Sequence, residues 1–100
     1  MYSGIKKKYP DRVPVIVEKA PKSALPDLDK RKFLVPNDVT VGQFIGIIRR
    51  RIKLDPAQAI FVFINNELPS LATPIVQIYD KHKSDDEALY MTYTGENTFG

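Results

Sequence analysis

The chain has 100 residues, a length that accommodates one hydrophobic core and predicts a single domain over residues 1–100. With 43% hydrophobic and 27% charged residues it has the composition of a globular protein, which excludes a disordered or collagen-like chain. It contains no cysteine, so disulfides, thiolate metal ligands and a thiol nucleophile are excluded. His82 is the one histidine and cannot build a multi-histidine metal site, so we expect neither a bound metal nor a cofactor.

Charge is distributed unevenly along the chain. Residues 1–53 hold 13 Lys and Arg against five Asp and Glu, whereas residues 54–100 hold two against seven, so the two halves carry +8 and −5. Such segregation attracts an acidic partner to one face, whether that partner is a peptide, an anionic membrane or a nucleic acid. No stretch approaches the roughly 18 apolar residues of a membrane span, and the first residues lack the apolar segment of a signal peptide, so we expect a cytoplasmic protein.

The first predicted strand covers Arg12–Lys19, which is rich in β-branched residues. Pro14 has no amide hydrogen and must lie where the strand needs no donor, at its start, at a sheet edge or beside a bulge. A loop containing two prolines, residues 20–29, follows. Lys32–Val35 is then a second short strand, closed by Pro36, and we expect the two strands to pair antiparallel.

A helix is predicted to begin after Thr40, because a Thr followed three residues later by Gln43 forms a capping box. Apolar residues then recur with helical spacing along one face: Val41, Phe44, Ile45, Ile48 and Ile52. Gly46 inside this helix costs about 1 kcal/mol relative to Ala. Basic residues at its C-terminal end complement the helix dipole: Arg49, Arg50, Arg51 and Lys53.

Three further elements complete the chain. Ile60–Ile64 is apolar at every position and is predicted to be a central strand covered on both faces. Pro74–Lys81 predicts a short helix with the proline at its first position, and Ala88–Thr94 alternates as a last strand. This order is satisfied most simply by an α+β roll of β-grasp type, with a mixed four-stranded sheet and the capped helix across one face. Residues 95–100 are expected to form a flexible tail.

Catalytic signatures are missing from the sequence. It has no G-x-S-x-G motif, no phosphate-binding loop and no metal-ligand spacing. The acidic run Asp85–Glu87 is interpreted as a solvated loop, and His82 as a surface or helix-capping residue. We therefore expect a protein that is not an enzyme and has no catalytic residues.

Two basic runs, Lys6–Lys8 and Arg49–Arg51, raise the question of nucleic-acid binding. Three consecutive residues point in different directions around a helix, so Arg49–Arg51 does not present one phosphate-binding face. We interpret these runs as solvated charges and expect no nucleic-acid partner.

The second strand has the features of a sheet edge, because it is short and bounded by proline. Such an edge can recruit an extended peptide, and the basic Lys30–Lys32 before it would attract acidic residues that flank that peptide. An edge strand that is merely protected by its charges is the alternative. At the other end of the chain, Phe99–Gly100 places a glycine carboxylate on a loose tail, which can enter a narrow enzyme channel. Together with a β-grasp fold, this tail suggests a ubiquitin-like modifier.

Four blocks of the sequence closely resemble the autophagy ubiquitin-like modifiers, the family of autophagy-related protein eight and GABARAP. They are KYPDRVPVIVEKA at 8–20, DKRKFLVP at 29–36, TVGQF at 40–44 and YTGENTFG at 93–100. The resemblance extends from about Ile5 to Gly100. It implies the ubiquitin-like β-grasp fold, with the two N-terminal helices of that family mostly absent from this chain.

The resemblance also implies a function and its partners. Gly100 matches the glycine that an E1-like enzyme activates and an E2-like enzyme transfers, through a thioester, to the amine of phosphatidylethanolamine. A cysteine protease processes and deconjugates such proteins. The lipidated form is expected on the autophagosome membrane, where it supports autophagosome formation and recruits cargo receptors that carry an acidic aromatic-x-x-aliphatic motif. A non-conjugated adaptor that binds the same peptides remains the alternative.

Peptide-binding residues follow from the resemblance by position. The pocket for the aromatic residue is expected to use Ile5, Pro14, Ile16, Lys32 and Leu34. The pocket for the aliphatic residue is expected to use Phe33, Val35, Pro36, Val39, Phe44 and Ile47. Lys30, Arg31 and Lys32 would meet the acidic flanks of the motif, and Arg12 matches a position that pairs with an acid of the bound peptide.

Three features depart from the family pattern. Without the N-terminal helices, the aromatic pocket is expected to be more open. Ala88 stands where the family usually has a large aromatic residue at the pocket floor, which would deepen the pocket or shift its preference. Gly46 stands where a bulky residue is usual.

Overall fold

The computed structural model describes residues 8–83 and 85–95. Four strands form one sheet: β1 (Arg12–Lys19), β2 (Lys32–Pro36), β3 (Phe61–Phe63) and β4 (Leu89–Thr94). Their order is β2-β1-β4-β3, with β1 antiparallel to β2, β1 parallel to β4, and β3 antiparallel to β4. The sheet is therefore mixed and four-stranded, as predicted.

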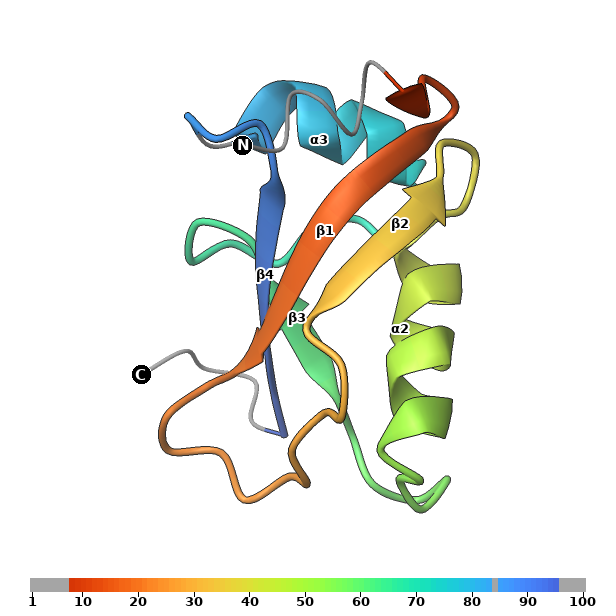
Figure 1. Cartoon of the computed structure of the whole chain (residues 1–100). Coiled ribbons are helices and arrows are strands. Elements are labelled where there is room, and N and C mark those ends of the chain that lie inside the picture. The colour runs from red at the N-terminus through yellow and green to blue at the C-terminus, as the bar shows by residue number, and fades with distance from the viewer. Residues whose placement is uncertain (1–7, 84, 96–100) are drawn as a thin grey trace.

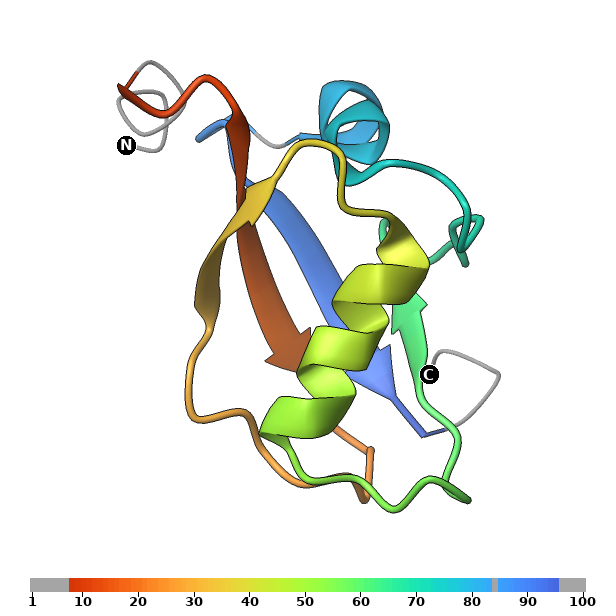
Figure 2. The ribbon, with the colours of Figure 1, turned by 90° about the vertical axis from the view of Figure 1, so that its right-hand side faces the viewer.

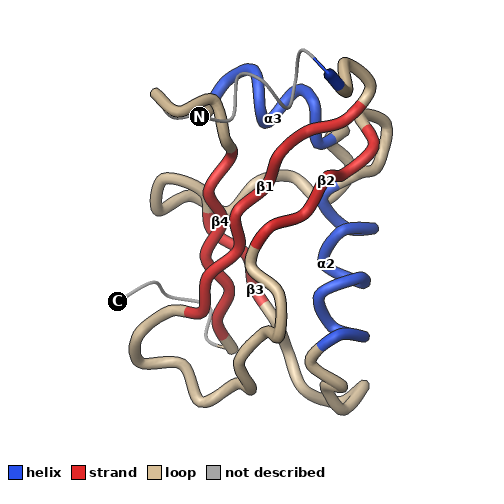
Figure 3. The backbone as a smooth tube through the Cα atoms, viewed as in Figure 1, coloured by secondary structure: helices blue, strands red, loops and turns tan. Residues whose placement is uncertain are grey.

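The described residues contain two helices with defined bounds, α2 (Val41–Arg51) and α3 (Ile75–His82). Figures 1 and 2 show α2 lying across one face of the sheet, whereas α3 lies at the end of the sheet where β1 and β4 begin. Figure 3 shows the helices in blue, the strands in red and the loops that join them in tan. Within the described residues no helix has the length and apolarity that crossing a membrane requires.

The predicted cap of α2 is confirmed in detail. The Thr40 hydroxyl accepts from the Gln43 amide at 3.2 Å, and the Gln43 side-chain oxygen accepts from the Thr40 amide at 2.9 Å. Two orphan donors at the helix start are thereby satisfied, which fixes where α2 begins relative to β2.

The main core lies between α2 and the sheet. From the helix it receives the predicted apolar face, with Val41, Phe44 and Ile48 at most 1% exposed. The sheet contributes alternate side chains of its strands, among them Val13, Val15, Val17, Leu89, Met91 and Tyr93. Because alternate residues of a strand point to opposite faces, the remaining side chains of β1 and β2 lie on the face away from α2.

Pro14 occupies a central strand without breaking the sheet. The Val17 amide donates to the Arg31 carbonyl at 2.8 Å, so odd-numbered residues of β1 turn their backbone groups toward β2. The nitrogen of Pro14 therefore faces the β4 side, one residue before pairing with β4 begins at Val15. Pro14 is the third residue of β1, so it lies near the start of the strand, just before the pairing with β4 begins.

The prediction for β3 was wrong in one respect. The strand is apolar as expected, but among the described strands it pairs with β4 alone and lies at an edge of the sheet, so it is not central. Val62 faces the main core, and Phe63 on the opposite face is only 6% exposed. Apolar residues at every position thus indicated correctly that both faces of this strand are covered. They do not indicate whether the strand has a hydrogen-bonded neighbour on each side.

Smaller differences concern the ends of elements. Pro74 is the N-cap of α3, with φ −62° and ψ 143°, and the helix begins one residue later than predicted. β4 begins at Leu89 and β2 extends to Pro36. The acidic run before β4 is a turn, in which Glu87 has a φ of 62° and the Tyr79 hydroxyl donates to its carbonyl at 2.9 Å.

Candidate functional site

The side chains of β2 alternate between the core and the surface. Phe33 is 8% exposed and Val35 is 3% exposed, and both belong to the main core beneath α2. Leu34, between them, points to the other face and is 38% exposed. This alternation confirms the prediction that Leu34 lies on one side of the strand and its two neighbours on the other.

The backbone of β2 alternates in the same way. Arg31 accepts from β1 at 2.8 Å, and the Asn37 amide donates to the Asp11 carbonyl at 3.0 Å, so odd-numbered residues of this segment face β1. The backbone groups of Leu34 therefore point away from β1. Because β2 is an edge strand, they point out of the sheet, where an extended peptide can add as a further strand.

A pocket of about 470 Å³ lies beside this edge, on the face away from α2. Its lining comprises Arg12, Pro14, Val15, Ile16, Lys30, Lys32, Phe33 and Leu34. Apolar side chains thus form its interior, and three cations lie around them. Among the described residues, no acidic side chain lines the pocket.

This pocket brings together most of the residues predicted for the aromatic position. Pro14, Ile16, Lys32 and Leu34 all line it, and so do Arg12 and Lys30, which were predicted to meet acidic residues. Ile5 and Gly100 lie outside the described residues.

The residues predicted for the aliphatic position are divided by burial. Phe33, Val35 and Phe44 are core residues, and the two phenyl rings meet edge to face with their centroids 5.4 Å apart. Val39 and Ile47 are partly buried and pack against that core, whereas Pro36 is exposed. The accessible part of this region is therefore Pro36 with the outer surfaces of Val39 and Ile47.

Ala88 lies behind the pocket. It is fully buried and packs against Ile16, which is 4% exposed and lines the pocket. The small side chain is thus in contact with the residue that forms the pocket interior.

Sequence reasoning missed a contribution from α2 to this site. The Arg51 guanidinium binds both carboxylate oxygens of Asp29, with Nε–Oδ1 at 3.3 Å and Nη2–Oδ2 at 3.2 Å. Its Cζ also lies 5.8 Å from the centroid of the Phe33 ring, and Lys30 Nζ lies 5.1 Å from the same centroid. Arg51 thus ties the segment before β2 to α2, although its position in the sequence indicated only a complement to the helix dipole.

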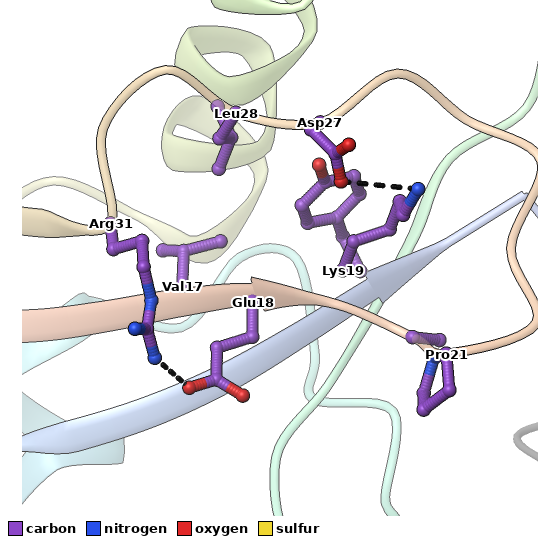
Figure 4. Close-up of a pocket in the computed structure, with 9 residues that line it drawn as sticks. Val17, Glu18, Lys19, Pro21, Asp27, Leu28 and Arg31 are labelled. Carbon is purple, nitrogen blue, oxygen red and sulfur yellow. Dashed lines mark hydrogen bonds and ion pairs between the residues drawn. The ribbon is translucent and has the colours of Figure 1, made fainter.

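The three basic residues before and within β2 do not act together. Lys30 and Lys32 line the pocket, but Arg31 forms an ion pair with Glu18 on the neighbouring strand. Figure 4 shows this pair beside a second pocket, of about 380 Å³, in which Lys19 and Asp27 form another ion pair at 3.1 Å. The cations of the second pocket are thus neutralised, and Arg31 is not among the residues that line the predicted peptide pocket.

A side chain of β4 forms a hydrogen bond with the loop that leads into β2. The Tyr93 hydroxyl donates to the Pro26 carbonyl at 2.7 Å, across 67 residues of sequence. Burial raises the pKa of Tyr93, and the nearby Asp27 carboxylate raises it further. This tyrosine is therefore neutral at physiological pH and remains a donor.

Arg12 reaches the same edge from β1. It lies opposite Pro36 in the pairing, and its Nη1 donates to the Leu34 carbonyl at 3.3 Å. The guanidinium is thus in contact with the outward-facing backbone of β2.

In the described part of the chain, no three His, Asp or Glu side chains lie close enough together to form a metal site.

Comparison with known proteins adds the family context. The family model described as autophagy protein Atg8, ubiquitin like, matches residues 2–100. Autophagy-related protein 8a of Arabidopsis thaliana is 60% identical over 98 residues, which cover 98% of this chain and 80% of the relative. Autophagy-related protein 8B of Oryza sativa subsp. japonica is 58% identical over 96 residues, which cover 96% and 81%. The crystal structure of Trypanosoma brucei ATG8 matches with a TM-score of 0.88 at 43% identity, covering 98% of this chain and 84% of that one.

Proposed function

The chain belongs to the Atg8 family of ubiquitin-like autophagy proteins, and we propose that it is a modifier joined through Gly100 to phosphatidylethanolamine. In this proposal the lipidated protein acts in autophagosome formation, passing from the cytoplasm to the autophagosome membrane. There it recruits cargo receptors and adaptors through an aromatic-x-x-aliphatic motif with acidic flanks.

The observation that carries the recruiting role is the outer edge of β2. Its Leu34 backbone faces out of the sheet next to a pocket with an apolar interior and three cations around it. Backbone pairing supplies affinity that is independent of sequence, and pockets for alternate side chains supply specificity. A peptide whose residues alternate between this pocket and the α2 side of β2 fits that arrangement.

Each part of the motif then has a place. The aromatic side chain enters the pocket over Pro14 and Ile16, and the aliphatic side chain covers the outer surfaces of Val39 and Ile47. Acidic residues of the peptide are attracted by Lys30 and the other two cations of the pocket.

The conjugating role uses the tail and the enzymes that act on it. The Gly100 carboxylate is activated by an E1-like enzyme with ATP, carried as a thioester on the cysteines of the E1-like and E2-like enzymes, and released when the lipid amine attacks it to form an amide. This chain contains no cysteine, so it contributes the carboxylate and the surfaces that the enzymes bind, and it catalyses none of these steps. A cysteine protease that cleaves after the glycine completes the cycle.

Intact-mass analysis tests the conjugating role. The protein is incubated with the E1-like and E2-like enzymes, ATP and liposomes that contain phosphatidylethanolamine, beside a Gly100→Ala control. We expect a mass gain of one lipid that the control lacks. No gain, while the protein still binds an acidic aromatic-x-x-aliphatic peptide, would favour the alternative function, a non-conjugated peptide-binding adaptor.

A further inference from the structure

The position of Arg12 has a consequence for how the β2 edge is opened. In an edge strand, a backbone carbonyl that faces out of the sheet is the acceptor that an added strand needs. The Leu34 carbonyl faces outward, and the Arg12 guanidinium already donates to it at 3.3 Å. An arriving peptide amide therefore meets a carbonyl that already accepts one hydrogen bond from a side chain of the same protein, and it must either share this acceptor or displace the guanidinium.

Arg12 reaches this carbonyl from the neighbouring strand. It lies at the start of β1 opposite Pro36 and on the face away from α2, so its side chain crosses β2 to contact Leu34 at the far side. It also lines the pocket beside the edge. The guanidinium thus lies where both the backbone and the acidic residues of a peptide would arrive.

We propose that Arg12 gates the β2 edge and makes an acidic residue in the peptide a condition for tight binding. In the unliganded protein its guanidinium caps the Leu34 carbonyl. A peptide carboxylate offers the guanidinium a stronger, charge-assisted partner, so Arg12 leaves the carbonyl for the carboxylate and the edge becomes available. The inference rests on the proposed peptide-binding function.

A peptide without acidic residues binds at a cost that an acidic peptide avoids. In displacing the guanidinium from Leu34 it offers no replacement partner, so it loses one hydrogen bond that an acidic peptide recovers. Arg12 therefore acts against such peptides as well as in favour of acidic ones, and specificity of this kind needs a repulsive element besides the attractive one. A residue that only attracted carboxylates would leave the binding of a neutral peptide unchanged when it is removed.

The test uses two peptides and three proteins. One peptide carries the aromatic-x-x-aliphatic motif with acidic flanks, and the other is identical except that Asn and Gln replace every Asp and Glu. Isothermal titration of both is carried out with the wild-type chain, with Arg12→Ala and with Arg31→Ala. Arg31→Ala is the matched control, because it removes the same charge near the same strand but leaves the Arg12 contact with Leu34 in place.

The gate predicts opposite effects for the two peptides. Arg12→Ala binds the neutral peptide about two- to fivefold more tightly than the wild type, the range expected for one exposed hydrogen bond that no longer has to be broken. The same variant binds the acidic peptide more weakly than the wild type. Arg31→Ala does not tighten binding of the neutral peptide.

Two results would overturn the gate while leaving the proposed function intact. The first is an Arg12→Ala protein that binds the neutral peptide no more tightly than the wild type, although the acidic peptide binds the wild type. The second is an equal tightening in Arg31→Ala, which would make the effect one of general charge. Failure of the acidic peptide to bind the wild-type chain would instead overturn the proposed function, and the gate with it.

Discussion

The two edges of the sheet differ in what surrounds their backbone. β2 presents five residues, the exposed Leu34 and a pocket with three cations around it. β3 presents three residues beside a pocket of about 260 Å³, where Arg49 is the one charged side chain among the described lining residues and donates to the Gln58 carbonyl at 2.7 Å. Both strands lie at sheet edges, so it is the side chains around β2 that favour it as the edge for the proposed acidic peptide.

The β2 edge also depends on the core behind it. Phe33 and Val35 anchor the strand beneath α2, while Leu34 between them faces the solvent. Removing an anchor should therefore affect stability, and removing Leu34 should affect binding.

The largest effect is expected from Phe44→Ala. This side chain is 1% exposed and packs edge to face on Phe33, so its loss leaves a cavity that should lower the free energy of unfolding by about 3–5 kcal/mol. Leu34→Ala, on the exposed face of β2, should change it by no more than about 0.5 kcal/mol. Urea unfolding followed by circular dichroism measures both, and equal losses would contradict the division of β2 into buried and exposed residues.

Leu34→Ala should instead weaken peptide binding. We expect the dissociation constant of the acidic aromatic-x-x-aliphatic peptide to rise about tenfold, as for a central residue of an interface. Leu71→Ala is the matched control, because Leu71 is 60% exposed and lines the pocket beside β3. Fluorescence anisotropy with a labelled peptide measures both dissociation constants. A larger loss of affinity in the Leu71 variant would indicate that the peptide binds at the β3 edge instead.

Tyr93→Phe tests how far the β2 edge relies on β4. Loss of the hydrogen bond to Pro26 should lower the free energy of unfolding by about 1 kcal/mol at neutral pH. The pKa of Tyr93 is raised by burial, so the folded state holds this proton more tightly than the unfolded state. The corresponding stability is complete below the unfolded pKa of about 10 and is lost as the pH rises through the folded pKa.

The measurement is the free energy of unfolding against pH between 8 and about 11.5, in the alkaline range where tyrosine ionises. The wild type should lose stability toward the upper end, and Tyr93→Phe should lose less. Some alkaline loss should persist in the variant, because burial also raises the pKa of Tyr79, whose hydroxyl donates to the Glu87 carbonyl. Identical alkaline slopes for the two proteins would show that Tyr93 is not bound as described.

The smallest effect is expected from Gly46→Ala, in the middle of α2. A Cβ at this position would meet no atom closer than the Arg50 guanidinium nitrogen at 3.9 Å, so the methyl group fits without strain. We expect the free energy of unfolding to rise by about 0.5–1 kcal/mol, because Ala is the better helix former. Peptide affinity should stay the same, because Gly46 is not among the residues that line the pocket, and a loss of affinity would mean that the peptide also contacts α2 at Gly46.

Local patterns predicted the parts of the fold whose causes are local. The bounds of β1 followed from its β-branched residues, and the start of α2 followed from the Thr40 and Gln43 capping box. The alternation of Phe33 and Leu34 likewise follows from strand geometry. The position of β3 could not be predicted in this way, because apolar side chains report how the faces of a strand are covered and do not report its neighbours.

Contacts between distant residues account for what was missed in the site. Arg51 meets Asp29 across 22 residues, and Arg12 meets Leu34 across the same separation. Arg31 was expected to join its basic neighbours at the peptide site, but the fold places Glu18 within its reach. Such pairings depend on strand register and on the course of the loops, and spacing along the sequence does not encode them.

Backbone amide exchange followed by NMR, with and without the acidic aromatic-x-x-aliphatic peptide, tests the central claim most directly. If the peptide adds to β2, the outward-facing amide of Leu34 becomes hydrogen-bonded and its exchange slows. The amides of Phe33 and Val35, which face β1, and those of Phe61–Phe63 should exchange as before. Slower exchange in β3, or unchanged exchange at Leu34 while the peptide is bound, would contradict the account.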